Sequence, residues 1–120
     1  MTMKRNVKTA TATIANGQSL SDAVALGTGF PAALQLPAAW TAAALTFQGS
    51  VDGGATYGNI YDDGVERTIA SASVVADRIL SLDQRDWHGL THIKIRSGTA
   101  AAAVNQGASR AIVVGLERGV

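Results

Sequence analysis

The residues best suited to acid–base chemistry are the aspartates Asp52, Asp62 and Asp63. Two carboxylates that flank one bond can act as general acid and base, and carboxylates from turns are ligands for Ca²⁺. Asp62 and Asp63 are adjacent, however, and successive side chains of a strand point to opposite faces of its sheet. The order Asp-Asp-Gly is typical of a turn, and the spacing of an EF-hand loop is absent. We therefore predict turns at these positions and no metal site.

The two histidines are the other residues whose spacing suggests a metal site. His88 and His92 are four residues apart, which would place both imidazoles on one face of a helix. Gly89 and the alternating pattern after it disfavour such a helix, and no glutamate adjoins His88 to complete a zinc motif. The chain also lacks cysteine, a Gly-x-Ser-x-Gly nucleophile motif and a Gly-Lys-Ser/Thr phosphate loop. We expect no catalytic residues, no cofactor and no enzymatic activity.

One short motif, at residues 50–57, resembles the Asp-box. The segment Ser-Val-Asp-Gly-Gly-Ala-Thr-Tyr follows the pattern Ser-x-Asp-x-Gly-x-Thr-Trp, with tyrosine in the last position. In such a turn the aspartate accepts backbone N–H bonds and the aromatic ring packs beneath. Sialidase-like propellers carry the motif once per blade, whereas it occurs once here, in a chain too short for a propeller. We predict a structural turn made by Ser50, Asp52, Gly54, Thr56 and Tyr57.

The elements around this motif predict a β-hairpin. Residues 45–51 alternate, and we expect Leu45, Phe47 and Val51 on the buried face. Asp52-Gly53-Gly54 predicts a tight turn, and β-branched and aromatic residues at 56–61 predict the return strand. Further strands are expected at 9–14, 20–26, 32–36, 65–70, 74–82, 90–97 and 110–116. For residues 19–26 an amphipathic helix is the alternative.

Several connections complete the expected fold. Residues 27–31 and 98–107 are predicted loops, and 83–89 is predicted to form one helical turn with Asp83 as its N-cap. Three consecutive apolar residues from Ile112 favour a strand that is covered on both faces. About eight short strands without helical periodicity predict an all-β fold, a two-sheet β-sandwich of the jelly-roll type.

Composition limits the classes of partner. The chain has 120 residues, one domain's worth, with 16% charged residues and a net charge of +1, so no strong field attracts nucleic acid or a membrane surface. No apolar run is long enough for a membrane span, and no apolar segment of a signal peptide follows the basic start. We expect synthesis in the cytoplasm, a flexible basic arm at 1–8 and a single sandwich domain at 9–118.

Four segments together resemble a family of small proteins encoded among the structural genes of tailed bacteriophages and prophages. They are Ile-Ala-Asn-Gly-Gln-Ser-Leu-Ser at 14–21, Leu-Pro-Ala-Ala-Trp-Thr-Ala-Ala-Ala-Leu-Thr-Phe-Gln at 36–48, the segment 50–57, and His-Ile-Lys-Ile-Arg-Ser-Gly-Thr at 92–99. The resemblance implies a virion structural protein, a cement or decoration protein on the capsid exterior, or a head–tail connector or tail component. It implies the major capsid protein and further copies of this chain as partners, without nucleic acid or membrane.

Contacts with such partners are predicted in three regions. These are the arm, the outward face of the strand at 90–97, and the part of the loop at 100–107, with Lys4, Arg5, Lys8, Lys94, Arg96, Asn105 and Gln106 as the contact residues. A hypothesis of another class is a carbohydrate-binding module. Its sugar-stacking platform would consist of the aromatic residues Trp40, Tyr57, Tyr61 and Trp87.

Overall fold

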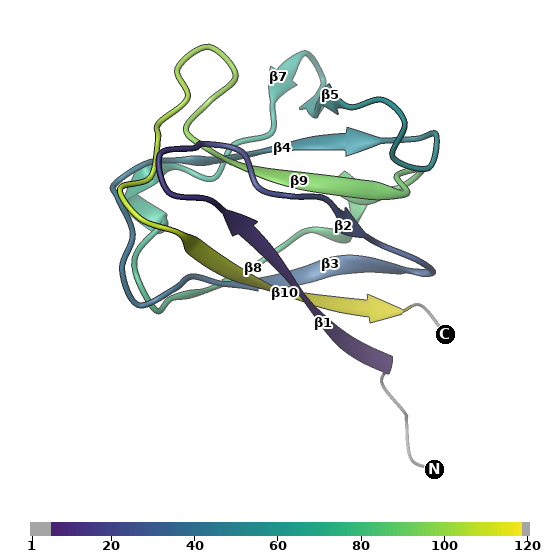
Figure 1. Ribbon diagram of the computed structural model, residues 1–120. Helices are drawn as coiled ribbons and strands as arrows, with labels where there is room; N and C mark the ends of the chain where they lie inside the picture. The colour runs from purple at the N-terminus through teal and green to yellow at the C-terminus, as the bar shows by residue number, and fades with distance from the viewer. Residues whose placement is uncertain (1–5, 119–120) are drawn as a thin grey trace.

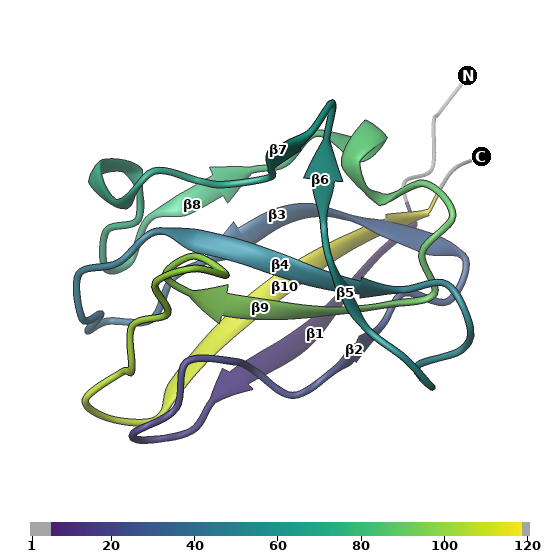
Figure 2. The ribbon, with the colours of Figure 1, turned by 90° about the horizontal axis from the view of Figure 1, so that it is seen from above.

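The computed structural model describes residues 6–118, and within them the chain is all-β. Ten strands form two four-stranded antiparallel sheets and one two-stranded ribbon (Figures 1 and 2). The strands are β1 (Asn6–Ile14), β2 (Val24–Ala25), β3 (Gly29–Gln35), β4 (Leu45–Ser50), β5 (Gly58–Asn59), β6 (Tyr61–Asp62), β7 (Val65–Glu66), β8 (Ile79–Ser81), β9 (His92–Ser97) and β10 (Arg110–Arg118). Two 3₁₀ turns, η1 (Ser71–Ser73) and η2 (Gln84–Trp87), complete the elements. The predicted all-β sandwich is confirmed.

The strand order is that of a jelly roll. One sheet has the order β1-β10-β3-β8 and the other β2-β9-β4-β5. Along the chain, β1 pairs with β10, β2 with β9, β3 with β8 and β4 with β5, all antiparallel. These nested pairs describe one long hairpin rolled up into two sheets, which is the double Greek key of this fold. The ribbon β6–β7 is an insertion between the fifth and sixth jelly-roll strands.

The core lies between the two sheets and consists of the inward side chains of both. Phe47 of β4 and Ile93 and Ile95 of β9 come from one sheet, and Ile112 and Val114 of β10 from the other, and each is at most 1% exposed. Complete burial of such a side chain stabilises the fold by about 1.5–3 kcal/mol. Ile93 and Ile95 alternate with polar residues in β9, and both point into the core. An apolar interior fixes which face of each strand turns inward, because a shift by one residue would expose these side chains.

The η2 turn closes one side of this core. The Trp87 ring meets the Phe47 ring edge-on, with centroids 5.0 Å apart. Asp83 caps the turn by accepting a 3.0 Å hydrogen bond from the Arg85 backbone N–H, as predicted. The side-chain hydrogen bond from Arg85 is also the main reason why the pKa of Asp83 is lowered to about 2.

The turn predicted at Asp62–Gly64 is confirmed, and positive φ angles explain the glycine there and at Gly17. Asp63 and Gly64 join β6 to β7, and both have positive φ, 54° and 78°. A two-residue turn with positive φ at both positions matches the twist of a hairpin, which explains the order Asp-Gly here. Gly17, after Asn16, has a φ of 79° and lies in the turn that follows β1.

Three predictions about the strands are wrong. Val51 lies outside β4 and is 72% exposed, because residues 51–57 form a longer loop rather than a tight turn. Val113 is 38% exposed, so β10 is covered on one face only. Residues 29–31 belong to β3 rather than to a loop. Proline is tolerated there because the register with β10 shifts at this point, at a β-bulge that contains Ala32.

Strand lengths also differ from those predicted. Strand β1 begins at Asn6, so Lys8 is a strand residue opposite Leu116 and not part of an arm. Lys4 and Arg5 lie outside the described residues. The strands expected at 20–26, 65–70 and 74–82 shorten to β2, β7 and β8. Among the described residues, no helix is long and apolar enough to cross a membrane.

Candidate functional site

The most unusual surface of the molecule is the outer face of the β1-β10-β3-β8 sheet. Cross-strand registers place Thr11, Val113, Gln35 and Ile79 in one row across the four strands. Paired residues share a face of the sheet. Residues two positions away along each strand lie on the same face and form the neighbouring rows. We call this surface the bare face and define it by ten residues: Thr9, Thr11, Thr13, Ala33, Gln35, Ile79, Ser81, Ala111, Val113 and Gly115.

The bare face is exposed and carries no charge. None of its ten residues is buried, and Ile79 and Val113 are 63% and 38% exposed. An antiparallel sheet that faces water on one side usually alternates apolar residues inward with polar and charged residues outward. The ten positions of the bare face are filled by Thr, Ala, Gly, Ser, Gln, Val and Ile. The first charged residue on the same face of β10 is Glu117, which is paired with Val7 beyond the end of the bare face. Depletion of charged residues is typical of the buried centre of a protein interface.

The outer face of the opposite sheet is buried around Arg96 of β9. Its guanidinium donates to Asn59 Oδ1 at 2.6 Å and to Glu66 Oε2 at 3.3 Å, and its side chain is only 9% exposed. Thr46, fully buried beside it, donates to the Gly98 carbonyl at 2.8 Å. This corrects the prediction of Arg96 as a contact residue, because its charge is paired inside the protein.

Lys94 is also engaged within the molecule. Its Nζ lies 4.3 Å from the centroid of the Tyr57 ring, a distance at which the ring attracts a cation. The lysine is half-buried rather than fully exposed. The outward face of β9 therefore does not present free basic side chains at Lys94 and Arg96, which were predicted as contact residues.

Gln106 joins three connections at one end of the sandwich. The side chain is 1% exposed, accepts from the Thr41 N–H at 2.9 Å and donates to the Thr41 carbonyl at 3.0 Å and to Ser97 Oγ at 2.7 Å. Its backbone carbonyl accepts from the Gly17 N–H at 2.9 Å. The prediction of Gln106 as a contact residue is therefore corrected: it is an internal support of the loops. The neighbouring Asn105 is exposed.

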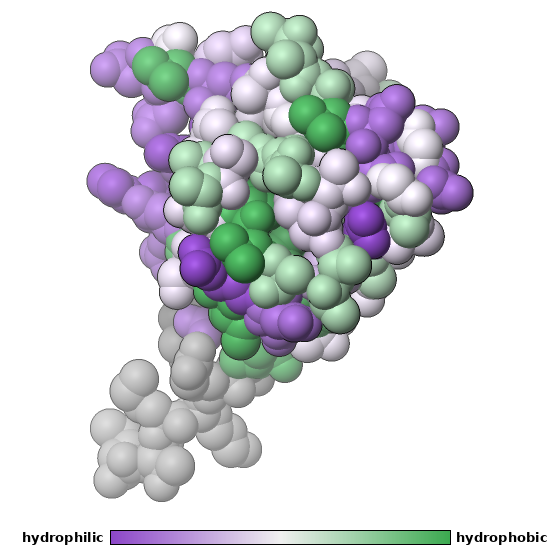
Figure 3. All heavy atoms as spheres, turned by 90° about the vertical axis from the view of Figure 1, so that its left-hand side faces the viewer, coloured by the Kyte–Doolittle hydropathy of each residue, from purple (hydrophilic) through white to green (hydrophobic). Residues whose placement is uncertain are grey.

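These connections make an alanine-rich end to the sandwich. Figure 3 looks onto this end, and residues of intermediate hydropathy cover much of it. The exposed alanines come from the connections before β4 and after β9: Ala38, Ala39, Ala42, Ala100, Ala101, Ala102 and Ala103. Small side chains at these positions permit close approach of another surface.

The Asp-box-like segment forms one hydrogen-bonded turn. Asp52 Oδ1 accepts from Ser50 Oγ at 2.7 Å and from the Thr56 N–H at 3.0 Å, and Asp52 Oδ2 accepts from Thr56 Oγ1 at 2.5 Å. The Gly54 N–H donates to Ser50 Oγ at 2.9 Å. The hydrogen bonds from Thr56 are the main cause that holds the pKa of Asp52 well below its usual range. The Asp52 carboxylate is thus occupied by the turn that it organises.

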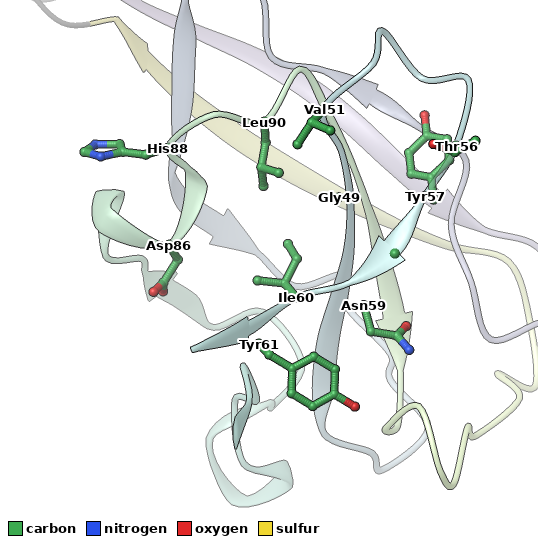
Figure 4. A pocket seen from close by; sticks show the side chains of 11 residues that line it. Gly49, Val51, Thr56, Tyr57, Asn59, Ile60, Tyr61, Asp86, His88 and Leu90 are labelled. Atoms are coloured by element: carbon green, nitrogen blue, oxygen red, sulfur yellow. The ribbon is translucent and has the colours of Figure 1, made fainter. Parts of the chain in front are cut away.

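A shallow groove of about 550 Å³ lies beside this turn (Figure 4). Ile60 and Leu90 contribute apolar side chains to it, and Tyr57 and Tyr61 contribute aromatic rings. A polar pocket of about 390 Å³ adjoins it, where Asp86 accepts a 2.6 Å bond from the Arg67 guanidinium. This combination of tyrosines with polar groups is suited to a weakly held polar ligand such as a saccharide.

The predicted four-ring platform is corrected by the structure. Trp87 is 3% exposed and packs in the core, and Trp40 is partly buried against the core with its Nε1 3.4 Å from the Ala43 carbonyl. Only Tyr57 and Tyr61 of the four aromatic residues line the groove. Within residues 6–118, no group of three or more His, Asp or Glu side chains is placed to hold a metal ion.

Sequence reasoning missed the bare face. A signal for it exists: the outward positions of two nine-residue strands, from Thr9 to Thr13 and from Ala111 to Gly115, carry no charge. The signal becomes visible only when the register of β1, β10 and β3 places these residues side by side. Comparisons of the chain with protein-family models, with curated proteins and with solved structures found no match.

Proposed function

We propose that this chain is a non-enzymatic virion structural protein of a tailed phage, a capsid cement or decoration protein that binds over major capsid protein subunits. The observation that carries the proposal is the bare face. The jelly-roll strand order and the resemblance of four segments to small phage structural proteins support it. On this proposal the protein is made in the host cytoplasm and acts on the capsid exterior, without a cofactor and without contact to nucleic acid or membrane.

The ten residues of the bare face include no charged side chain, which favours docking on another protein surface. Docking a charged surface removes water from ions, which is costly unless each ion finds a partner. Val113 and Ile79 in this face lose water without such a cost, and apolar burial contributes about 25 cal/mol per Å². A single copy binds modestly by this means. Many copies across subunit joints stabilise a shell together, because each tethers neighbours that are already assembled.

The test is binding to particles that lack the protein. Particles assembled from the neighbouring structural genes, with this gene deleted, are incubated with purified protein and sedimented. The variant Val113→Lys places a charge at the centre of the bare face, and we expect at least a tenfold loss of bound copies, in line with an unpaired charge at an interface. The matched control is Val65→Lys in β7, where Val65 is 69% exposed and away from the bare face. Equal binding of both variants would refute this use of the face.

A connector or tail component is the same kind of protein in another place. The bare face would then dock on a ring of subunits rather than on the shell. Copy number distinguishes the two positions, because a connector ring holds only about a dozen subunits whereas cement covers the whole shell. We expect the higher copy number, that of a protein that covers the whole shell.

A second candidate function is carbohydrate binding, and the groove with Tyr57 and Tyr61 favours it. Sugar rings stack on tyrosine faces, while the amide of Asn59 and other polar groups at the rim supply hydrogen bonds. A glycan array probed with the wild type and with Tyr61→Ala tests this function. Binding that is lost in the variant supports it, and the absence of any bound glycan removes it.

A further inference from the structure

The β1 strand is the one long open edge among the sheets of residues 6–118. In the sheet orders, the edge strands are β1 and β8 in one sheet and β2 and β5 in the other. Three of these edges are short, with three, two and two residues, whereas β1 has nine. Short edge strands are a common protection against pairing with another chain. Strand β1 lacks this protection, and it contains no proline and no bulge in its pairing with β10.

The free groups of this edge can be identified from one contact. The Thr13 N–H donates to Asp22 Oδ1 at 2.8 Å, and the Thr13 carbonyl accepts from the Asp22 N–H at 3.2 Å. The backbone groups of Thr13 therefore point away from β10. Since this direction alternates along a strand, Val7, Thr9 and Thr11 also point their N–H and C=O groups outward. No strand of the described chain pairs with that side of β1.

We propose that a second copy of this chain pairs with this edge, β1 against β1, antiparallel about a two-fold axis at Thr9. In that register Thr9 faces Thr9 of the second copy, and Val7 faces Thr11. Every outward N–H from Val7 to Thr11 then meets a carbonyl of the second copy. Asp22 limits the register, because it already occupies the backbone groups of Thr13.

Self-complementarity identifies the occupant as a second copy. A two-fold interface brings the same patch together from both subunits, and an antiparallel edge offers donors and acceptors in an order that matches its own reverse. The side chains agree with this: threonine pairs directly across antiparallel strands are favourable. Lys8 of one copy would face Ala10 of the other, so the two lysines do not face each other directly.

The dimer deepens the proposed function, on which its biological role rests. A two-fold axis perpendicular to the sheet joins the two β1-β10-β3-β8 sheets into one continuous sheet. The two bare faces then lie side by side on the same side of that sheet. One dimer presents twice the uncharged surface to the shell and spans a joint between two capsid subunits.

The first test uses the purified chain alone, so its outcome is independent of capsid binding. The protein has no cysteine, and Thr9→Cys introduces one at the two-fold axis. Directly paired residues of antiparallel strands have Cα atoms about 5.5 Å apart, which a disulfide spans. Mild oxidation should convert most of Thr9→Cys to a disulfide-linked dimer. The matched control is Ser81→Cys, on the same face but on the short edge strand β8, and it should stay monomeric. Equal cross-linking of both variants, or none in Thr9→Cys, overturns the proposal.

The second test removes one hydrogen-bond donor. Thr9→Pro deletes an N–H that has no partner strand within one copy, so the monomer should fold, as thermal unfolding checks. Analytical ultracentrifugation from roughly 10 µM to about 1 mM should show a dimer for the wild type and a dissociation constant at least about tenfold weaker for Thr9→Pro. Thr9→Val keeps the backbone donor and should dimerise like the wild type. A wild type that stays monomeric throughout, or a dimer that Thr9→Pro leaves unchanged, contradicts the proposal.

Discussion

Replacement of Gln106 by alanine should destabilise the protein severely, although a glutamine in a loop is an ordinary candidate for a surface contact. Its side chain makes four hydrogen bonds, with the Thr41 N–H and C=O, Ser97 Oγ and Arg110 Nε, at 2.7–3.0 Å. Each contributes about 1 kcal/mol net, and buried partners left without a hydrogen bond add to the loss. We expect about 3–4 kcal/mol, a large share of the roughly 5–15 kcal/mol that stabilises a domain.

Urea unfolding followed by circular dichroism measures this loss, and the melting temperature should fall by about 10 °C or more. The matched control is Asn105→Ala, at the exposed neighbouring position, which should change the free energy of unfolding by less than about 0.5 kcal/mol. The same stability in both variants, with weakened particle binding only in Gln106→Ala, would show that Gln106 is a contact residue and that the reasoning from burial fails.

Three further variants test other parts of the structure. Arg96→Leu removes the cation paired with Glu66, whose carboxylate then keeps the hydrogen bond from the Ala100 N–H, and should lower the free energy of unfolding in urea by about 3 kcal/mol. Gly98→Ala should lower the free energy of unfolding by at least about 3 kcal/mol, because φ is +90° and a Cβ would lie 2.5 Å from a backbone oxygen. In the control Gly107→Ala, the nearest atom to the new Cβ is 3.6 Å away, and the free energy of unfolding should change by less than about 1 kcal/mol. Hydrogen bonds from Thr56 lower the pKa of Asp52 in the folded state. The carboxylate therefore stabilises the fold above its ordinary pKa of 3.8, and this stabilisation is lost as the pH falls toward the folded-state pKa. In Asp52→Asn, the melting temperature should depend less on pH in this acidic range.

The fold was predictable where one face of a strand is apolar and the other polar. Leu45 and Phe47, like Ile93 and Ile95, alternate with polar residues because one side of each strand lies in the core. The same alternation is uninformative at Ile112, Val113 and Val114, where three apolar residues leave the outward position undefined. Val113 faces outward on a surface without charge, and local sequence does not distinguish that from burial.

The candidate contact residues were less predictable, because burial of a polar group depends on distant partners. Arg96 is buried because Glu66 and Asn59, thirty and thirty-seven residues earlier in the chain, bind its guanidinium. Gln106 is buried because Thr41 lies sixty-five residues away in sequence but adjacent in space. Jelly-roll topology creates such contacts by nesting early strands against late ones, and spacing along the chain does not reveal them.

The central claim is that the bare face seats this protein on a capsid shell. Its most direct measurement is co-sedimentation of purified protein with particles of the neighbouring structural genes, with copy number from quantitative gel densitometry. We predict a saturable number on the order of hundreds of copies per particle, as shell-wide binding requires. About a dozen copies would place the protein at a connector or tail, and no association with the particles would contradict the claim.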